Sequence, residues 1–317
     1  MATAFSPANS VTTTTAAKFI PQIWSDEIVA AYKKNLVLAN LIKKMSFKGK
    51  KGDTVHIPAP TRGSASAKAS TVAVTLIAAT ESEVQVSINK HYEYSRLIED
   101  IVEAQALSSL RNFYTEDAGY ALARQVDTDL VQLGRAFNGA TVGTDDYATA
   151  TSSTKAYIGS DGTTAYNSST SNAAALTDAA IRRTIQRLDD NDVPMDGRFF
   201  IIPPSSRNTL MGLARYTEQA FVGDAGGGNT IRNGEIGNLY GIPVFVTSNA
   251  DTGAGTSGTD RICLMGHRDA MVLVEQLGIR SQTQYKQEFL GTLFTADTLY
   301  GVSELRDTSC VPIIVLA

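Results

Sequence analysis

The side chains best suited to acid–base or metal chemistry near neutral pH are three histidines, His56, His91 and His267. No two of them lie within a few residues of each other, so the spacing of a helical zinc-binding pair is missing. The two cysteines, Cys263 and Cys310, stand in apolar surroundings and are predicted to be small buried side chains. These residues predict no catalytic group, no metal site and no bound cofactor.

Two short motifs resemble ligand-binding loops without meeting their requirements. A phosphate-binding loop needs Gly-Lys-Ser/Thr at the start of a helix, whereas Gly226, Gly227 and Gly228 are followed by Asn229. The acidic run 189–192 resembles part of a calcium loop, but a proline stands in a ligand position and no glutamate follows at the required distance. We expect a flexible glycine-rich loop and a solvated helix end.

A cluster of lysines near the start of the chain is the best candidate for contact with phosphate groups. It comprises Lys43, Lys44, Lys48, Lys50 and Lys51. Lysines neutralise phosphate charge without reading base sequence, and a single aromatic residue, Phe47, lies among them. The segment predicts either a solvated helix terminus or a weak, non-specific contact with nucleic acid.

The composition limits the functions available. The chain has 317 residues, with 28 Lys and Arg against 32 Asp and Glu, and charged residues make up only 19 % of it. The resulting net charge of −4 argues against a dedicated nucleic-acid-binding protein, which usually carries a strongly basic domain. No apolar run approaches the ~20 residues that span a bilayer, and the polar first residues are unlike a secretory signal. We expect a globular protein without a membrane partner.

The elements that would position these residues begin with a long N-terminal excursion. Residues 1–50 are predicted to form an extended arm and a first helix, with the lysines at the end of that helix. Two runs with apolar residues at every second position then predict paired strands joined by a loose tip. Their apolar residues are Val72, Val74, Leu76, Val84, Val86 and Ile88. Because an isolated hairpin is barely stable in water, we expect this face, with Phe5 and Phe19 of the arm, to contact another subunit.

The rest of the chain alternates helical and strand-like patterns. Apolar residues at helical spacing predict a short and then a long helix over 95–137, and the small polar residues of 139–174 predict an inserted surface loop. An α/β region follows over 175–278, then a polar, β-prone stretch and a final apolar strand. Several of these elements cannot bury their apolar faces within one chain, which indicates a subunit of an assembly.

The order of these features resembles the major capsid proteins of tailed phages of the Hong Kong 97 type. Four segments carry the resemblance, and their order matters more than any single motif: 20–25, 52–58, 198–204 and 237–244. The most specific of them reads Gly-Asn-Leu-Tyr-Gly-Ile-Pro-Val and leads into a predicted strand. Nearly the whole chain takes part.

The resemblance implies an α+β, Hong Kong 97-type capsid fold in five parts. These are an N-terminal arm and first helix at 1–50, an extended β-loop at 51–94, a peripheral domain with a long spine helix at 95–138 and 279–305, the inserted polar loop at 139–174, and an α/β axial domain at 175–278 and 306–317. The loop with Gly226, Gly227, Gly228 and Asn229 would lie near the axis of a capsomer.

The function implied is assembly rather than enzymatic turnover. Copies of the chain would form hexamers and pentamers of the icosahedral head of a tailed double-stranded DNA phage, a part of the virion assembled in the host cytoplasm. Candidate partners are separate scaffolding, portal and cement proteins and the packaged DNA. Two alternatives stay open from the sequence: an encapsulin-like compartment shell, which shares the fold, and a soluble α/β enzyme.

Overall fold

The computed structural model describes residues 37–49, 51–60, 63–74, 76, 81–101, 109–213, 237–253 and 260–317. Its helices are α1 (Leu38–Leu41), α3 (Ser109–Leu133), α4 (Asp178–Asp190) and α5 (Pro204–Met211). Its strands are β1 (Lys43–Ser46), β2 (Thr54–Pro60), β3 (Glu81–Ser87), β4 (Lys90–Glu99), β5 (Ser153–Ile158), β6 (Ala165–Tyr166), β7 (Arg198–Ile202), β8 (Asn238–Leu239), β9 (Ile242–Val246), β10 (Arg261–His267), β11 (Met271–Lys286), β12 (Gly291–Glu304) and β13 (Cys310–Val315). Helices and strands are mixed along the chain, as the α+β prediction requires.

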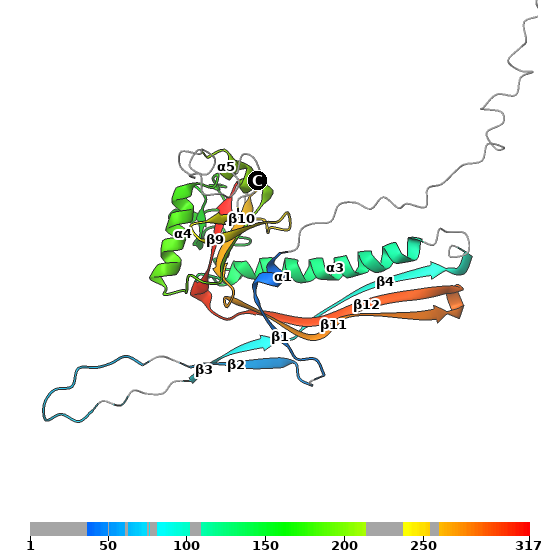
Figure 1. Cartoon of the computed structure of the whole chain (residues 1–317), viewed down its shortest axis with the longest axis horizontal. Helices are drawn as coiled ribbons and strands as arrows, with labels where there is room; N and C mark the ends of the chain where they lie inside the picture. The colour runs from blue at the N-terminus through cyan, green and yellow to red at the C-terminus, as the bar shows by residue number, and fades with distance from the viewer. Residues whose placement is uncertain are drawn as a thin grey trace, which may run out of the picture.

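A four-stranded sheet forms the elongated half of the molecule, in the order β1-β11-β12-β4 (Figure 1). The long hairpin β11–β12 is its centre, and helix α3 runs along the sheet. The contact is made by Ala118 and Leu122 of the helix with Phe294 and Ala296 of β12. Burying one side of this strand against the helix fixes the helix as a strut along the sheet.

A seven-stranded sheet, in the order β6-β5-β13-β10-β7-β9-β8, forms the other half. Because successive side chains of a strand point to opposite faces, β7 divides its apolar residues between two cores. Phe200 and Ile202 pack on the side of α4, and Phe199 and Ile201 pack with the end of α3. Each face of the sheet is therefore covered by a different helix.

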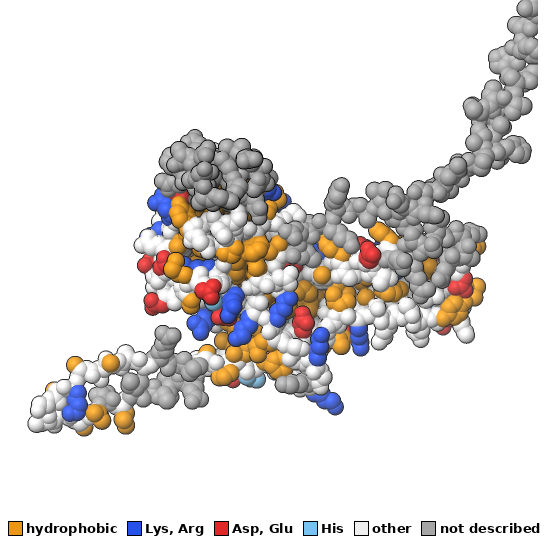
Figure 2. All heavy atoms as spheres, in the orientation of Figure 1, with side chains coloured by type: hydrophobic (Ala, Val, Ile, Leu, Met, Phe, Trp, Pro, Cys, Tyr) orange, Lys and Arg blue, Asp and Glu red, His pale blue; other side chains and the backbone are white. Residues whose placement is uncertain are grey.

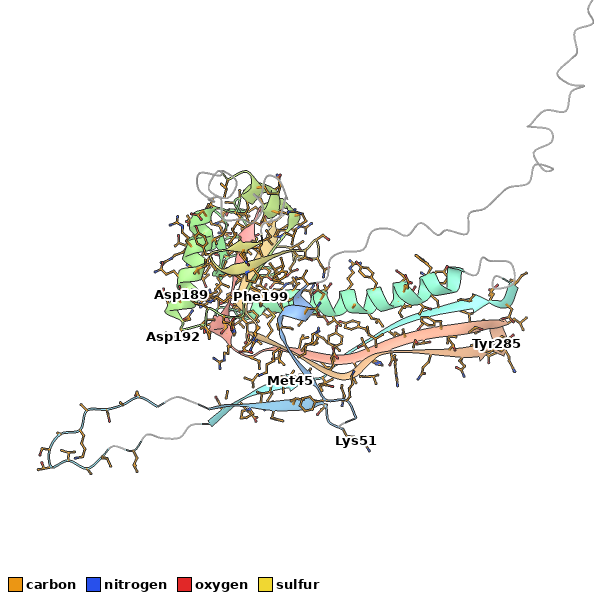
Figure 3. All side chains as sticks on the ribbon, viewed as in Figure 1. Met45, Lys51, Asp189, Asp192, Phe199 and Tyr285 are labelled. Carbon is orange, nitrogen blue, oxygen red and sulfur yellow. The ribbon has the colours of Figure 1, made fainter. Side chains whose placement is uncertain are left out.

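One cluster of buried residues joins the two sheets. It combines Leu130 of α3, Phe199 and Leu264 of the seven-stranded sheet, and Leu273 and Tyr300 of the four-stranded sheet. Figure 3 shows Phe199 where the two halves meet. The cluster indicates that the two sheets are stabilised together rather than as separate units.

The third sheet is the hairpin β2–β3, in which Thr54 to Pro60 pair antiparallel with Ser87 to Glu81. The segment between the two strands projects away from the body of the molecule (Figure 1). Its residues 63–74 and 76 form no strand. The predicted pairing of the two apolar runs with each other is therefore wrong. The strand that pairs with residues 81–87 is 54–60 and not 72–76. Two prolines, Pro58 and Pro60, are tolerated there because β2 is an edge strand.

Two helix predictions are corrected by the structure. Residues 95–99 belong to β4, which pairs with β12 along its whole length. The apolar pair Leu97 and Ile101, four residues apart, fits helical spacing equally well, and this misled the period assignment. Lys43 and Lys44, predicted at a helix end, lie in β1, which pairs parallel with β11. The helix α1 before them has a single turn.

Residues 139–174 are also more structured than the sequence indicates. They carry β5 and β6, at one edge of the seven-stranded sheet, so the prediction of a polar surface loop is wrong. Tyr147, Ile158 and Tyr166 are buried there with Ile262 and Ile314. Widely spaced aromatic residues in a Ser/Thr/Gly-rich stretch give no periodic signal, although each is a core residue. By contrast, the predicted helix cap is confirmed, since Thr177 Oγ1 accepts a hydrogen bond from the backbone N–H of Ala180.

Candidate assembly surfaces

The projecting segment between β2 and β3 exposes large apolar side chains to solvent. The exposed fractions are 58 % for Val72, 67 % for Val74 and 88 % for Leu76. Figure 2 shows orange side chains on this projection, which extends clear of the rest of the chain. Apolar groups held this far from the body of a protein usually mark an interaction site.

The apolar residues of β3 and the apolar residue that follows it are less exposed than those of the projecting segment. Val86 and Ile88 are buried beneath the four-stranded sheet, against Val272 and Val274 of β11, and Val84 is half-buried. The expectation that this whole face contacts a neighbouring subunit is wrong for Val86 and Ile88, because the chain's own sheet already covers them. Their burial anchors the base of the projection.

Polar contacts fix the hairpin at that base. His56 Nδ1 and Glu83 Oε2 lie 3.0 Å apart across the two strands, and Ser82 Oγ donates to the carbonyl of Ala59 at 2.7 Å. Hydrogen bonds from Gln85 and from His56 lower the pKa of Glu83. His56 is thus a cross-strand partner of Glu83 within the hairpin.

The lysines do not form one patch. Lys43 and Lys44 are exposed on β1, the open edge of the four-stranded sheet, and Lys44 Nζ donates to Asn40 Oδ1 at 3.3 Å. Lys48 lies over Gly278 of β11, and Lys51 is exposed at the turn before β2 (Figure 3). Met45 and Phe47 between them pack into the core with Val55. The described lysines of the cluster thus lie on a strand edge and in the turns beside it, and not at a helix end.

Several predicted contact residues lie outside the described part of the chain. These are Phe5 and Phe19 of the arm, Gly226, Gly227, Gly228 and Asn229 of the glycine-rich loop, and Lys50.

A buried polar network that the sequence did not reveal connects the turn after α3 to the segment between β9 and β10. Arg135 binds Asp251 through two hydrogen bonds, Nε to Oδ2 at 2.7 Å and Nη2 to Oδ1 at 2.8 Å, and the Tyr147 hydroxyl donates to Oδ2 at 3.2 Å. The bond to Asp251 raises the pKa of Arg135, and burial raises the pKa of Tyr147. Charge-assisted, bidentate geometry of this kind makes a firm link.

Further carboxylates, from α3 and from β12, hold the strands of the four-stranded sheet in place. Asp129 lies 3.1 Å from Lys90 Nζ and accepts a hydrogen bond from the Tyr300 hydroxyl at 2.7 Å. Burial, together with Asp129, raises the pKa of Tyr300. Arg280 binds Asp297 at 2.7 Å and 2.9 Å and lowers its pKa. These arrangements neutralise charge and orient strands, and none of them presents a free nucleophile or base.

The remaining candidates for chemistry are dispersed. Burial raises the pKa of the Cys263 thiol to about 12, and that of Cys310 is raised for the same reason, so both stay protonated. Among the described residues, no three His, Cys, Asp or Glu side chains gather in a way that could hold a metal ion. No helix in the described ranges has the length and apolar character needed to cross a bilayer.

Comparisons with known proteins agree with this geometry. The family model described as phage capsid protein matches residues 25–307. A solved structure from Mycobacterium phage Che8 superposes with a TM-score of 0.73 at 23 % identity, over 93 % of this chain and 97 % of that one. The capsid of the cyanophage P-SCSP1u gives 0.73 at 18 % identity, over 98 % of both chains. The comparison with curated proteins found no match. With a family model that covers most of its length, the chain belongs to the phage capsid protein family.

Proposed function

We propose that this chain is the major capsid protein of a tailed phage and that its copies assemble, as hexamers and pentamers, into an icosahedral head around double-stranded DNA. The exposed apolar projection with Val72, Val74 and Leu76 is the single observation that carries the assembly step. A protein that worked as a monomer would leave these side chains in water at a cost of roughly 25 cal/mol per Å² of apolar area. In a shell, a neighbouring copy covers them.

The parts of the fold suit distinct roles in such a shell. The seven-stranded sheet corresponds to the axial domain, and the four-stranded sheet with α3 corresponds to the peripheral domain. β11 crosses the boundary expected at 278/279, because it runs unbroken from Met271 to Lys286. We infer that the β2–β3 projection is the extended β-loop, that the chain has no enzymatic activity, and that scaffolding, portal and cement proteins are separate partners.

The test removes the apolar character of the projection. The triple variant Val72→Asp, Val74→Asp, Leu76→Asp is expected to leave a folded subunit, because these side chains contact solvent in the isolated chain. It is expected to form no shells, because three carboxylates without counter-charges would have to be buried against the apolar surface of a neighbouring copy. Circular dichroism melting measures the folding, and electron microscopy of the expressed protein measures assembly.

The matched control is Val72→Ile, Val74→Ile, Leu76→Met, which keeps the apolar surface and is expected to form shells. Normal particles from the aspartate variant would contradict the proposed role of the projection. Particles that contain a cargo protein instead of DNA would contradict the phage-head function.

A further inference from the structure

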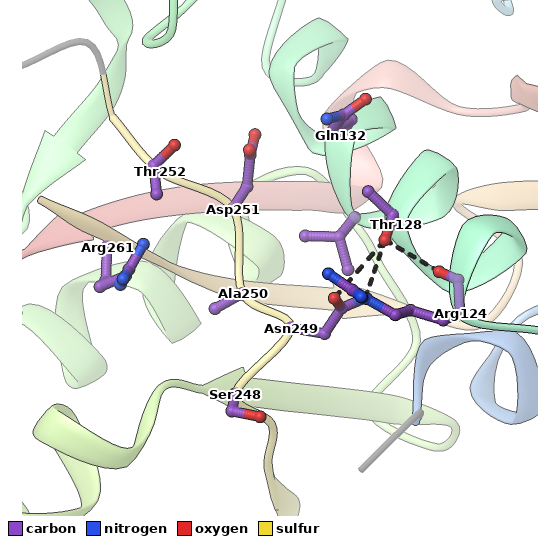
Figure 4. Close-up of a pocket in the computed structure, with 10 residues that line it drawn as sticks. Arg124, Thr128, Gln132, Ser248, Asn249, Ala250, Asp251, Thr252 and Arg261 are labelled. Atoms are coloured by element: carbon purple, nitrogen blue, oxygen red, sulfur yellow. Dashed lines mark hydrogen bonds between the residues drawn. The ribbon is translucent and has the colours of Figure 1, made fainter. Parts of the chain in front are cut away.

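A polar cavity of about 240 Å³ lies between α3 and the segment that follows β9 (Figure 4). Arg124 of α3 and Arg261 at the start of β10 both line it. Neither guanidinium makes a hydrogen bond or ion pair with any residue in the described ranges. Two cations without a carboxylate thus border one small cavity.

Two further polar groups of the cavity wall, Asp251 and Asn249, already have partners. Asp251 is neutralised by Arg135. Asn249 Nδ2 donates to Asp127 Oδ2 at 3.0 Å and to Thr128 Oγ1 at 3.2 Å. The wall is therefore held in place, and the two arginines leave the cavity with a net positive charge. Guanidinium groups bind carboxylates with well-defined geometry, so a carboxylate is the group that this cavity fits.

Unpartnered carboxylates stand at the end of α4. Asp189 binds Arg198 at 2.7 Å, but Asp190 and Asp192 are exposed, and their carboxylates have no hydrogen bond or ion pair within the described residues. Acidic side chains at a helix C-terminus oppose the helix dipole and destabilise the helix. Asp190 and Asp192 therefore gain nothing from contacts within the described residues of one chain.

The cavity and the acidic end of α4 lie on opposite faces of the seven-stranded sheet. The end of α3 covers the face that carries Phe199 and Ile201, whereas α4 covers the face that carries Phe200 and Ile202. Figure 3 shows Asp189 and Asp192 on the outer flank, away from α3. Two complementary surfaces on opposite faces are what a head-to-tail contact between identical copies requires.

We propose that Asp190 and Asp192 of one copy dock at the cavity of the next copy and bind Arg124 and Arg261 there. This inference rests on the proposed function and names one contact within its capsomers. Every copy gives its α4 end to one neighbour and receives the other neighbour's at its cavity. The contact is heterologous, because the two surfaces differ and neither pairs with itself, and its repetition forms a ring where the rotation between neighbours closes, as it does in a hexamer or pentamer.

The test exchanges the charges on the two sides of the contact. Asp190→Arg with Asp192→Arg places cations opposite cations, and Arg124→Glu with Arg261→Glu places acids opposite acids. Each double variant is expected to lower the yield of rings and shells at least about tenfold, because like charges at an interface strongly oppose association. The quadruple variant restores opposite charges at every contact and is expected to return the yield close to that of the original chain.

The control is Glu99→Lys with Glu116→Lys, which changes the net charge as much as the first variant but on the four-stranded-sheet half. Native mass spectrometry counts rings, electron microscopy counts shells, and thermal melting of the unassembled subunit shows that each variant folds. Equal ring yields in both double variants and the original chain would overturn the contact. A quadruple variant that folds but stays as poor as the doubles would do so too. An original chain that forms no rings at all would overturn the proposed function and this contact with it.

Discussion

Buried carboxylates hold distant parts of this chain together. The sequence does not indicate which residues are their partners. Asp251 lies 116 residues from Arg135, and Asn249 lies 122 residues from Asp127. No local pattern marks such pairs, because neither residue affects the periodicity around the other. The sequence therefore indicated nothing of this buried network.

The Arg135–Asp251 pair makes the first prediction. Asp251→Asn leaves the largely buried guanidinium without its counter-charge and is expected to lower the free energy of unfolding by about 3 kcal/mol. Chemical denaturation of the unassembled subunit measures the change. The control is Arg182→Gln, which removes an exposed pair with Asp178 on α4 and should cost about 0.5 kcal/mol or less. Equal losses in the two variants would show that the buried pair has no special weight.

Asp161 makes a prediction about pH. Burial opposes its ionisation, but hydrogen bonds from the Thr164 hydroxyl and from the backbone N–H groups of Thr164 and Thr163 outweigh burial and lower its pKa to about 2. A carboxyl with a lowered pKa stabilises the fold above its unfolded value of 3.8, and this contribution disappears as the pH falls toward 2.

Asp161→Asn is therefore expected to be less stable than the original chain at pH 7 and to approach it as the pH falls below about 4. Denaturation curves between pH 7 and pH 3 measure the difference. Thr164→Val removes one donor and should show a smaller loss in the same pH window. A difference that stays constant across this range would contradict the role given to the ionised carboxylate.

At the scale of elements, apolar periodicity succeeded where one face of an element is buried and failed where the packing is set by distant strands. α4 with its Thr177 cap and the buried strands β7, β9, β10 and β13 follow the predicted order. Residues 95–99 of β4 were predicted as the start of a helix, because the inward side chains of the strand are mainly tyrosines and no aliphatic alternation marks it. The predicted run 72–76 alternates like a strand but has no partner strand within the described chain.

The close approach of two elements makes the third prediction. A Cβ at position 301 of β12 would clash with the backbone carbonyl of Ser87 at the end of β3. Gly301→Ala is expected to cost about 2 kcal/mol and to loosen the base of the projection, which limited proteolysis of the subunit detects. Gly119→Ala is the control: its Cβ would meet nothing within 4 Å, and replacing glycine inside α3 should add about 1 kcal/mol of stability. Unchanged proteolysis of the Gly301 variant would contradict the contact.

At the scale of the whole molecule, the order of elements predicted the fold better than any element did alone. The order of arm, extended loop, long helix and α/β unit in the sequence predicted the capsid fold. The family model and the structural matches confirm that prediction. The junction between the two sheets was not predictable, because Leu130, Phe199 and Tyr300 come from three distant segments. Hydrophobic residues in a sequence indicate that a side chain is buried, but they do not indicate which other residues it packs against.

This shared junction predicts that the two sheets unfold together. Leu130→Ala removes a fully buried side chain and is expected to cost about 3 kcal/mol. Hydrogen exchange should then rise in both β7 and β12, because their packing depends on the same cluster. The control is Leu188→Ala, in the core on the α4 side, which should raise exchange in the seven-stranded sheet most. Exchange confined to one sheet in the Leu130 variant would show that the halves are independent.

The edge strand β1 affects how fast subunits associate incorrectly during shell growth. An unpaired strand edge is a template for any other extended segment, and subunits made at high concentration meet each other through it constantly. Lys43 and Lys44 stand exposed on that strand, so a second copy brings the same positive charges to the same place. We expect this repulsion to slow edge-to-edge stacking and to keep free subunits for the contacts that close a particle of finite size.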